Sequence, residues 1–383
     1  MIIGILGYTP LIGRGASRSW SKLTYYVART LLRRGHEVVF SPAFDAAKVT
    51  GVYVRIDGRE CPMVEAGDLK DYGCDLALVT FAAHLCAPYE CSARHRAFEA
   101  FDRVLAAVRT SVRRVVAYTS LDLYEDVPAL TLEYLAKRFD AVVFFNDADA
   151  RVFGEHLKAA GAQAPPVFVV TPGVDTKLYT PGRPAEEPVL LYVGRNSVEK
   201  DPARLMAVLA KLRRRGLNAR LVMVTNPCGF WPYGTFDLQA AARSMGVADS
   251  VAFVEEFVEE ERMPELYRSA RVFITLSGSE GVCLPMLEAQ ACGVPVVAQD
   301  LPSLRSVYGD SYVRVAREGS FHLPFGTMPL ASVEDAASKV GWLLEDEDLR
   351  REYSRRGLGN AARYDWDGAV GPGLERALGQ ALA

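Results

Sequence analysis

Residues 271–300 carry the pattern that restricts the fold most. The apolar run Val272–Leu276 predicts a buried strand, and Ser277–Ser279 predict a turn. Cys283–Ala291 then predict a helix, and Val294–Ala298 a second strand. A strand, a loop, a helix and another strand in this order form one compact unit of a sheet that is covered by helices.

The same order of strand, loop and helix recurs along the chain. Residues 2–6 are apolar and lead through a glycine-containing loop into a helix with apolar residues on one face. Residues 189–193 lead in the same way into a helix that starts after residue 200. Repeated steps of this kind are typical of a doubly wound α/β fold, so the sequence predicts this fold class.

The length requires more than one core, because 383 residues exceed a single ordinary domain. The segment 171–188 is rich in proline and glycine, which predicts a linker between two domains. Beyond residue 300 we expect a Pro/Gly-rich turn region at 321–330 and an amphipathic helical stretch at 332–358.

The composition excludes several classes of protein. Apolar residues make up 50% of the chain and charged residues 24%, as in soluble globular proteins. A net charge of −3 supplies no broad basic field, so we expect no nucleic-acid partner. The chain has no apolar run long enough to span a membrane and no CxxC pair among its 7 cysteines, which predicts a cytoplasmic protein with reduced thiols. A slight basic excess before residue 182 leaves open a peripheral contact of the N-terminal half with the inner membrane face.

Two glutamates frame the predicted helix. Glu280 directly precedes it, so its carboxylate and the N–H groups of Gly281, Val282 and Cys283 are expected to face one small volume that favours anions. Glu288 follows after about two helical turns and is expected to point from the same face. Two interpretations are open. The pair grips one elongated ligand, or Glu280 stabilises the helix dipole and Glu288 is a solvated surface residue.

Loops in the first half offer weaker candidates. Gly13 and Gly15 would let the backbone approach a phosphate, although such glycines also serve tight turns. One span holds residues close enough in sequence to chelate zinc: His84, Cys86, Cys91 and His95. Their spacing fits no common zinc module. We therefore favour a plain loop at the carboxyl end of a strand, where it would line a cleft, and predict no metal site.

These features together resemble the retaining GT-B glycosyltransferases of the large group 1 family. Residues 280–298, EGVCLPMLEAQACGVPVVA, resemble the family's Glu-x7-Glu segment, commonly written EGFGLPxLEAMACGxPVVA. Cys283 stands in place of the usual glycine, which narrows this loop and bears on the choice of sugar. Residues 171–181, TPGVDTKLYTP, resemble the family's PNGVDxxxFxP hinge. The resemblance covers nearly the whole chain and is strongest over residues 189–300.

The resemblance implies a fold and a reaction. The fold is GT-B, with two Rossmann-like domains facing a central cleft: an acceptor-side domain at 1–180 and a nucleotide-sugar domain at 181–365. Residues 366–383 would form a helix that crosses back onto the first domain. The reaction is a retaining, metal-independent hexosyl transfer without a cofactor. The donor would be a UDP-, GDP- or ADP-sugar, and the acceptor an unidentified sugar, glycolipid or small molecule.

The resemblance also implies roles for individual residues of the second half. Glu280 would hold the hydroxyls of the donor sugar and Glu288 those of the ribose. Arg195 and Lys200, which follow Gly194, would receive the leaving diphosphate, whose negative charge such cations stabilise without a metal. The backbone N–H groups that contact the sugar and the phosphate would be those of Gly281, Val282, Cys283 and Leu284.

One motif of the family is incomplete in this chain. The family's T-x-H-D segment aligns with Thr119–Asp122, where Leu121 replaces the histidine. The retained Asp122, and His84 at the end of another predicted strand, are the two candidate catalytic residues of the first half. The missing histidine also fits an alternative function, a non-catalytic nucleotide-sugar-binding homologue that acts as a partner subunit. The retained Arg195, Lys200 and glutamates favour the enzyme.

Overall fold

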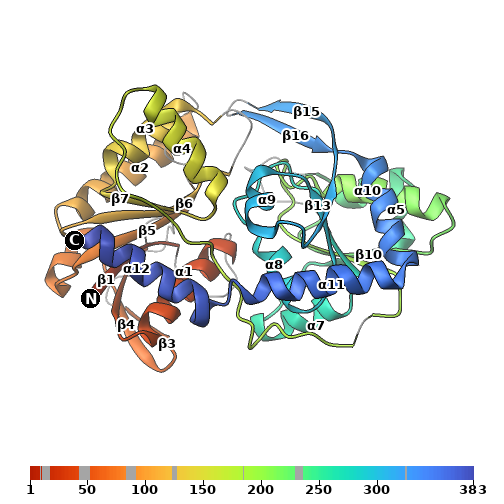
Figure 1. The fold of residues 1–383 in the computed structure, drawn as a ribbon, viewed down its shortest axis with the longest axis horizontal. Helices are drawn as coiled ribbons and strands as arrows, with labels where there is room; N and C mark the ends of the chain where they lie inside the picture. Colours follow the sequence, from red (N-terminus) through yellow and green to blue (C-terminus); the bar gives the residue numbers. More distant parts are fainter. Residues whose placement is uncertain are drawn as a thin grey trace. The chain divides into compact units, whose positions relative to one another are not determined.

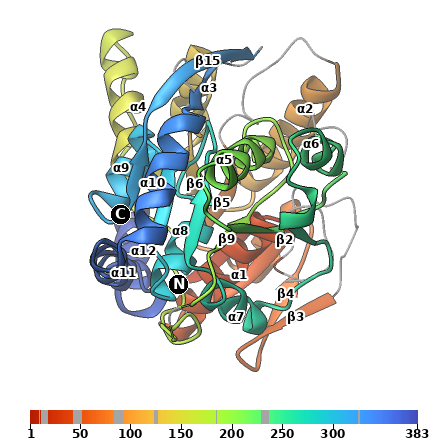
Figure 2. The ribbon, with the colours of Figure 1, turned by 90° about the vertical axis from the view of Figure 1, so that its right-hand side faces the viewer.

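The computed structural model describes residues 1–8, 10, 18–42, 52–82, 92–122, 127–183, 185–228, 236–323 and 326–383. The described chain forms two compact units, which Figure 1 and Figure 2 show in two views. The first unit consists of Met1–Leu123, Val127–Pro172 and Trp366–Ala383, and Gly173–Asp365 build the second. Each unit has its own sheet of mostly parallel strands, so the predicted α/β class is confirmed.

The sheet of the first unit runs in the order β3-β4-β2-β1-β5-β6-β7-β8. Its strands are β1 (Ile2–Gly7), β2 (Glu37–Pro42), β3 (Val52–Ile56), β4 (Arg59–Met63), β5 (Leu76–Ala82), β6 (Val115–Ser120), β7 (Ala141–Phe144) and β8 (Val167–Val169). β3 and β4 form an antiparallel hairpin at one edge, and the other neighbours are parallel. The order reverses between β1 and β5. The loops that follow these two strands contain Gly13, Gly15 and His84, which lie outside the described residues.

Helices cover both faces of this sheet. On one face, the buried cluster joins strand residues such as Val79 to Phe101 of α2 (Ser92–Arg109), Leu135 of α3 (Ala129–Arg138) and Phe153 of α4 (Asp147–Ala159). Leu69 of the 3₁₀ helix η1 (Ala66–Tyr72) belongs to the same cluster. α1 (Arg18–Arg33) and α12 (Gly371–Leu382), which are far apart in sequence, pack against each other (Figure 1).

Trp366 ties the end of the chain to the first unit. It starts a π-helical turn, η5 (Trp366–Val370), that leads into α12. Trp366 is 1% exposed, and its ring stacks on Tyr26 of α1 with the centroids 5.6 Å apart. Thr30 Oγ1 donates a hydrogen bond to the Trp366 carbonyl oxygen (3.0 Å), and Arg34 pairs with Glu375 of α12. Residues 366–383 therefore form part of the first unit's core.

The sheet of the second unit is parallel and runs in the order β11-β10-β9-β12-β13-β14. Its strands are β9 (Val189–Val193), β10 (Arg220–Val224), β11 (Val251–Val254), β12 (Val272–Thr275), β13 (Val296–Gln299) and β14 (Val313–Val315). Its helices are α5 (Pro202–Arg214), α6 (Leu238–Ser244), α7 (Met263–Arg268), α8 (Leu284–Ala291), α9 (Pro302–Tyr308), α10 (Val333–Glu345) and α11 (Glu347–Ala362), with short 3₁₀ turns at Ala248–Ser250 and Glu260–Arg262.

The core of the second unit follows from the alternation of side chains along its strands. Leu190 and Val272 belong to a buried cluster that includes Leu209 of α5 and Val340 of α10. The helices α5 and α10 pack side by side (Figure 2). The neighbouring Phe273 contacts the ring of Tyr267 in α7, with centroids 6.0 Å apart. α8 packs along α11 (Figure 1).

Beyond residue 300, the structure differs from the sequence prediction in two places. The turn region expected at 321–330 is wrong, because β15 (Arg317–Leu323) and β16 (Gly326–Ala331) form an antiparallel hairpin. Pro329 is tolerated in β16 because each strand of a two-stranded hairpin has one edge without a partner strand. The helical stretch at 332–358 is two helices. Asp346 separates them, since its N–H donates to the Trp342 carbonyl (2.8 Å) and its Oδ1 accepts from the Leu349 N–H (2.9 Å). Among the described helices, none is long and apolar enough to cross a membrane.

The two tryptophans at positions 366 and 342 make a matched pair for testing this fold. Trp366→Ala should lower the free energy of unfolding of the first unit by about 3–5 kcal/mol, the usual cost of removing a buried aromatic side chain. Trp342 is 53% exposed, so Trp342→Ala should change stability by less than about 0.5 kcal/mol. Urea unfolding of both variants measures the difference. Equal stability of the two variants would contradict the role given to Trp366.

Candidate functional site

The candidate site lies at the centre of the second sheet. The strand order reverses between the neighbours β9 and β12. In a doubly wound sheet, ligands bind at the carboxyl ends of the strands at such a reversal. Here the loops that leave these ends are residues 194–201 and 276–283. They carry the predicted Arg195, Lys200 and Glu280, so the topology supports the assignment made from the sequence.

Lys200 and Glu280 meet directly across these two loops. Lys200 Nζ lies 2.8 Å from Glu280 Oε1, and it also donates to the Ser279 carbonyl oxygen at 3.4 Å. A backbone hydrogen bond from the Gly278 N–H to the Glu199 carbonyl (2.9 Å) sets the distance between the loops. The predicted cation and the predicted carboxylate therefore form one ion pair.

This ion pair is mostly shielded from water. The exposed fractions of the side chains are 18% for Lys200 and 8% for Glu280. Burial by itself would lower the pKa of Lys200, but the negative charge of Glu280 opposes this effect and the pKa lies above its ordinary value. Lys200 is therefore a fixed positive charge at neutral pH.

Arg195 is held beside the pair by contacts that the sequence analysis missed. Its Nη2 donates to Glu199 Oε1 (2.9 Å), which also accepts a hydrogen bond from Ser197 Oγ (2.7 Å). Its carbonyl oxygen accepts from the hydroxyl of the buried Tyr192 (2.8 Å). A Cβ at Gly194 would lie 2.5 Å from that hydroxyl, which explains why glycine follows the strand. The Arg195 side chain is 52% exposed.

The segment between Glu280 and α8 is fixed from one side. Ser303 Oγ donates to the Glu280 carbonyl (2.5 Å), and the Tyr308 hydroxyl contacts the carbonyls of Val282 (2.9 Å) and Cys283 (3.0 Å). Ser303 and Tyr308 both belong to α9. In a planar trans peptide the C=O and the following N–H point in opposite directions. The N–H groups of residues 281, 283 and 284 therefore point away from α9, as a site for an anion requires.

Glu280 and Glu288 are not related by helical spacing, contrary to the expectation from the sequence. α8 begins at Leu284 with Cys283 as its N-cap, so Glu280 lies in the preceding loop and only Glu288 is helical. Glu288 is 5% exposed, and its Oε2 accepts a hydrogen bond from the Tyr267 hydroxyl at 2.6 Å. It is therefore no solvated surface residue, which removes the second of the two open interpretations for this position.

The β15–β16 hairpin packs against Gly278, in the loop that carries Glu280. A Cβ at Gly278 would lie 2.3 Å from Met328 Cγ and 2.7 Å from the Pro329 carbonyl oxygen. Only glycine fits this contact without displacing the hairpin or the loop that carries Glu280. No local sequence pattern pointed to Met328 or Tyr267, because their roles depend on contacts between segments that are far apart in the chain.

The described candidates of the first unit lie around the end of β6. Asp122 adopts a left-handed backbone with φ of 46°, and its Oδ1 accepts from Ser120 Oγ (2.8 Å). Leu121 is buried, and its N–H donates to Oδ2 of the buried Asp149 (2.8 Å). Gly13, Gly15, His84, Cys86 and Cys91 lie outside the described residues, as does the side chain of His95. Among the side chains that the structure describes, no group of three or more His, Cys, Asp or Glu could hold a metal ion.

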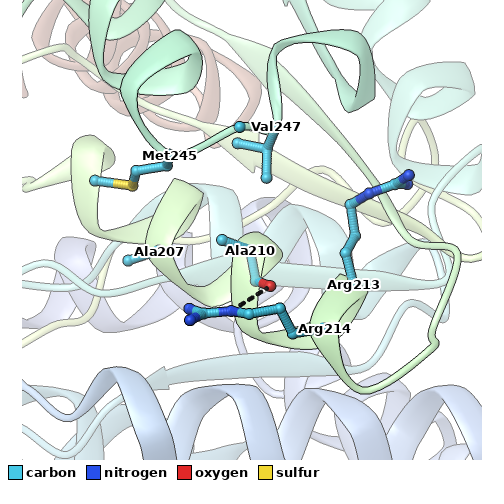
Figure 3. A pocket seen from close by; sticks show the side chains of 7 residues that line it. Ala207, Ala210, Arg213, Arg214, Met245 and Val247 are labelled. Atoms are coloured by element: carbon cyan, nitrogen blue, oxygen red, sulfur yellow. Dashed lines mark hydrogen bonds between the residues drawn. The ribbon is translucent and has the colours of Figure 1, made fainter.

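A separate surface hollow of about 620 Å³ lies between the end of α5 and the turn after α6 (Figure 3). Ala207, Ala210, Met245 and Val247 line it, and Arg214 Nε donates to the Ala210 carbonyl at 3.3 Å. None of the predicted site residues lines this hollow, so it is not part of the candidate site.

Comparison with solved structures defines the class of fold. The chain matches sucrose-phosphate synthase from Thermosynechococcus elongatus with a TM-score of 0.74 and 16% identity, over 99% of this chain and 98% of the other. It matches HepE from Anabaena in complex with UDP-glucose with a TM-score of 0.69 and 15% identity, over 99% and 100% of the two chains. These likenesses show that the chain has the GT-B fold of two Rossmann-like domains.

Comparison of sequences finds similar proteins among the glycosyltransferases. The group 1 glycosyl transferases match residues 177–359. A D-inositol 3-phosphate glycosyltransferase from Acidothermus cellulolyticus is 34% identical over 224 residues, which are 55% of this chain and 47% of that protein. Another from Xylanimonas cellulosilytica is 32% identical over 259 residues, 63% of this chain and 58% of that protein. The chain thus spans about half the length of these curated relatives. The likeness to the group 1 glycosyl transferases is confined to residues 177–359, somewhat less than half of the chain.

Asp149 makes the stability of the first unit depend on pH. Burial raises the pKa of its carboxyl to about 8, with a smaller contribution from the charge of Asp122. The ordinary value is about 4, so between about pH 4 and pH 8 the folded chain holds a proton that the unfolded chain has lost. Stability should therefore fall as the pH rises through this window.

Asp149→Asn should reduce this fall in stability, because an amide does not titrate. Urea unfolding of the variant and the wild type at about pH 5 and pH 8 measures the effect. Asp147→Asn, at an exposed position of the same helix, is the control and should keep the wild-type difference. An unchanged pH dependence in Asp149→Asn would show that Asp149 has an ordinary pKa.

Proposed function

We propose that this protein is a retaining, metal-independent glycosyltransferase that moves a hexose from a nucleotide sugar to an acceptor. The single observation that carries the proposal is the Lys200–Glu280 ion pair at the switch point of the second sheet. It joins a cation suited to a diphosphate to a carboxylate suited to sugar hydroxyls. The match of residues 177–359 to the group 1 glycosyl transferases supports the same reaction.

The leaving diphosphate would be received by Lys200 and Arg195. Negative charge develops on it as the bond to the sugar breaks, and cations that are already in position stabilise this charge. Glu199 and Tyr192 hold the Arg195 side chain and backbone. The N–H groups of residues 281, 283 and 284, which point away from α9, would bind oxygens of the phosphate and of the sugar.

The two glutamates would bind the two ends of the donor. Glu280, beside the phosphate-binding Lys200, would accept hydrogen bonds from the hydroxyls of the sugar. Glu288, held by Tyr267, would accept them from the ribose. We assign the acceptor to the first unit. HepE was solved in complex with UDP-glucose, which makes UDP-glucose the first donor to test beside GDP- and ADP-glucose.

A second function, a nucleotide-sugar-binding subunit without catalysis, is favoured by Leu121. This buried apolar side chain stands where the family has a histidine, and its backbone is held by Asp149. Asp122 and His84 are the first-unit candidates for catalysis under the main proposal. The two functions differ in one measurement, because only the enzyme releases the nucleoside diphosphate when donor and acceptors are supplied together.

Lys200→Ala should weaken binding of the nucleoside diphosphate at least about tenfold, the value of a charge-assisted hydrogen bond, and change binding of the nucleoside less than about twofold. Glu280→Gln should lower turnover about a hundredfold and leave diphosphate binding nearly intact. A thermal screen of the three glucose donors identifies the nucleotide, and calorimetric titration then gives the affinities.

Matched controls come from the same unit. Arg213→Ala removes an exposed cation of α5, and Glu265→Gln an exposed carboxylate of α7. Both should bind and turn over as the wild type does. Equal losses of nucleoside and diphosphate affinity in Lys200→Ala would remove Lys200 from the phosphate site. Normal turnover by Glu280→Gln would remove Glu280 from the sugar.

A further inference from the structure

Asp201 directly follows Lys200 and has an unusual backbone conformation. Its φ of 40° and ψ of 52° lie in the left-handed region, which residues with a side chain rarely adopt. The next residue, Pro202, favours an extended conformation at Asp201 instead. Because the local chain opposes the observed conformation, contacts from other side chains are needed to stabilise it.

Arg204 makes such contacts with Asp201. Its Nε donates to Asp201 Oδ2 at 2.7 Å, and its backbone N–H donates to the Asp201 carbonyl oxygen at 3.2 Å. The two side chains are 17% and 13% exposed, so solvent screens this ion pair little. Arg204 therefore ties both the side chain and the backbone of Asp201 to the first turn of α5.

The same guanidinium is anchored to the β15–β16 hairpin. Nη1 of Arg204 donates to Glu318 Oε1 of β15 (2.6 Å) and to the Ala331 carbonyl oxygen of β16 (3.1 Å). The hairpin also packs against Gly278 through Met328. It therefore braces both loops of the candidate site, one by direct packing and the other through Arg204.

The position of Lys200 depends on the conformation of Asp201. The N–H groups of both residues donate to the Ser197 carbonyl oxygen, each at 3.1 Å. They belong to one tight turn, which enters α5 at Pro202. A change of φ at Asp201 would rotate this turn, and Lys200 with it, relative to α5.

We propose that Arg204 is a positioning residue that keeps Asp201 in the left-handed conformation and so places Lys200 for the leaving diphosphate. The inference rests on the proposed function, in which Lys200 binds the diphosphate. Arg204 acts through the backbone and needs no contact with the ligand. It raises the population of the conformation in which Lys200 Nζ lies at the site, beside Glu280.

Arg204→Ala tests the inference, with the affinity for UDP relative to uridine as the readout. This ratio isolates the contribution of the diphosphate, and calorimetric titration gives both affinities. We expect the ratio to fall about fivefold, because a smaller share of the molecules holds Lys200 in the binding position. GDP with guanosine, or ADP with adenosine, replaces the uridine pair where the thermal screen selects it.

A double variant separates positioning of Lys200 from a role in holding the hairpin alone. Glycine adopts the left-handed conformation without help, because it has no Cβ. Arg204→Ala combined with Asp201→Gly should therefore recover the ratio to within about twofold of the wild type. A ratio that stays as low as in Arg204→Ala would overturn the inference, since the loss of the hairpin contact would then explain the effect.

Two single variants test the same point while Arg204 keeps its contacts with the hairpin. Asp201→Ala and Asp201→Gly both lose the ion pair, but only alanine opposes the left-handed backbone. The ratio should fall about fivefold in Asp201→Ala and stay within about twofold of the wild type in Asp201→Gly. Equal ratios in these two variants would contradict the inference. Glu318→Gln removes only the charge that faces Arg204 from the hairpin, so it is the control and should keep the wild-type ratio.

The outcome also distinguishes this inference from the proposed function. A wild-type protein that binds none of the three nucleoside diphosphates more tightly than its nucleoside contradicts both together. A low ratio in Lys200→Ala with a wild-type ratio in Arg204→Ala contradicts the inference alone. Rescue of Arg204→Ala by Asp201→Gly supports the action of Arg204 through the backbone.

Discussion

The ion pair between Lys200 and Glu280 is the interaction on which the rest of the site depends. Both side chains are mostly out of water, and removing one partner of a buried pair costs about 3–5 kcal/mol, so each requires the other. The pair forms only because β9 and β12 are neighbours in the sheet and the backbone of Gly278 is bonded to that of Glu199. The order of the strands in the sheet therefore determines that these two charged side chains meet.

The same pair restricts what the site can bind. Lys200 can leave Glu280 at low cost only for another strong negative charge, and a diphosphate supplies one while a neutral sugar does not. Glu280 would then need new donors, and under the proposed function the sugar hydroxyls would provide them. The α9 residues Ser303 and Tyr308 keep the carbonyls of this loop away from the anion. Under the proposed function, recognition of a charged leaving group and recognition of a sugar would be coupled through one pair of side chains.

Much of this arrangement could be predicted from the sequence. The apolar runs predicted the strands, and the segment from Glu280 to Ala298 indicated the fold and the proposed donor site. Local patterns failed where the answer depended on distant contacts. Helical spacing did not relate Glu280 to Glu288, because α8 begins after the loop, and Tyr267 and Met328 are brought to the site only by the packing of other segments. The β15–β16 hairpin was missed because its proline and glycine content is typical of turns.

A crystal structure of the protein with UDP-glucose tests the central claim most directly. The account predicts that Lys200 Nζ leaves Glu280 and lies within hydrogen-bond distance of the diphosphate. Glu280 should contact the hydroxyls of the glucose, and Glu288 the ribose. An intact Lys200–Glu280 pair with the nucleotide bound elsewhere in either unit would contradict the account.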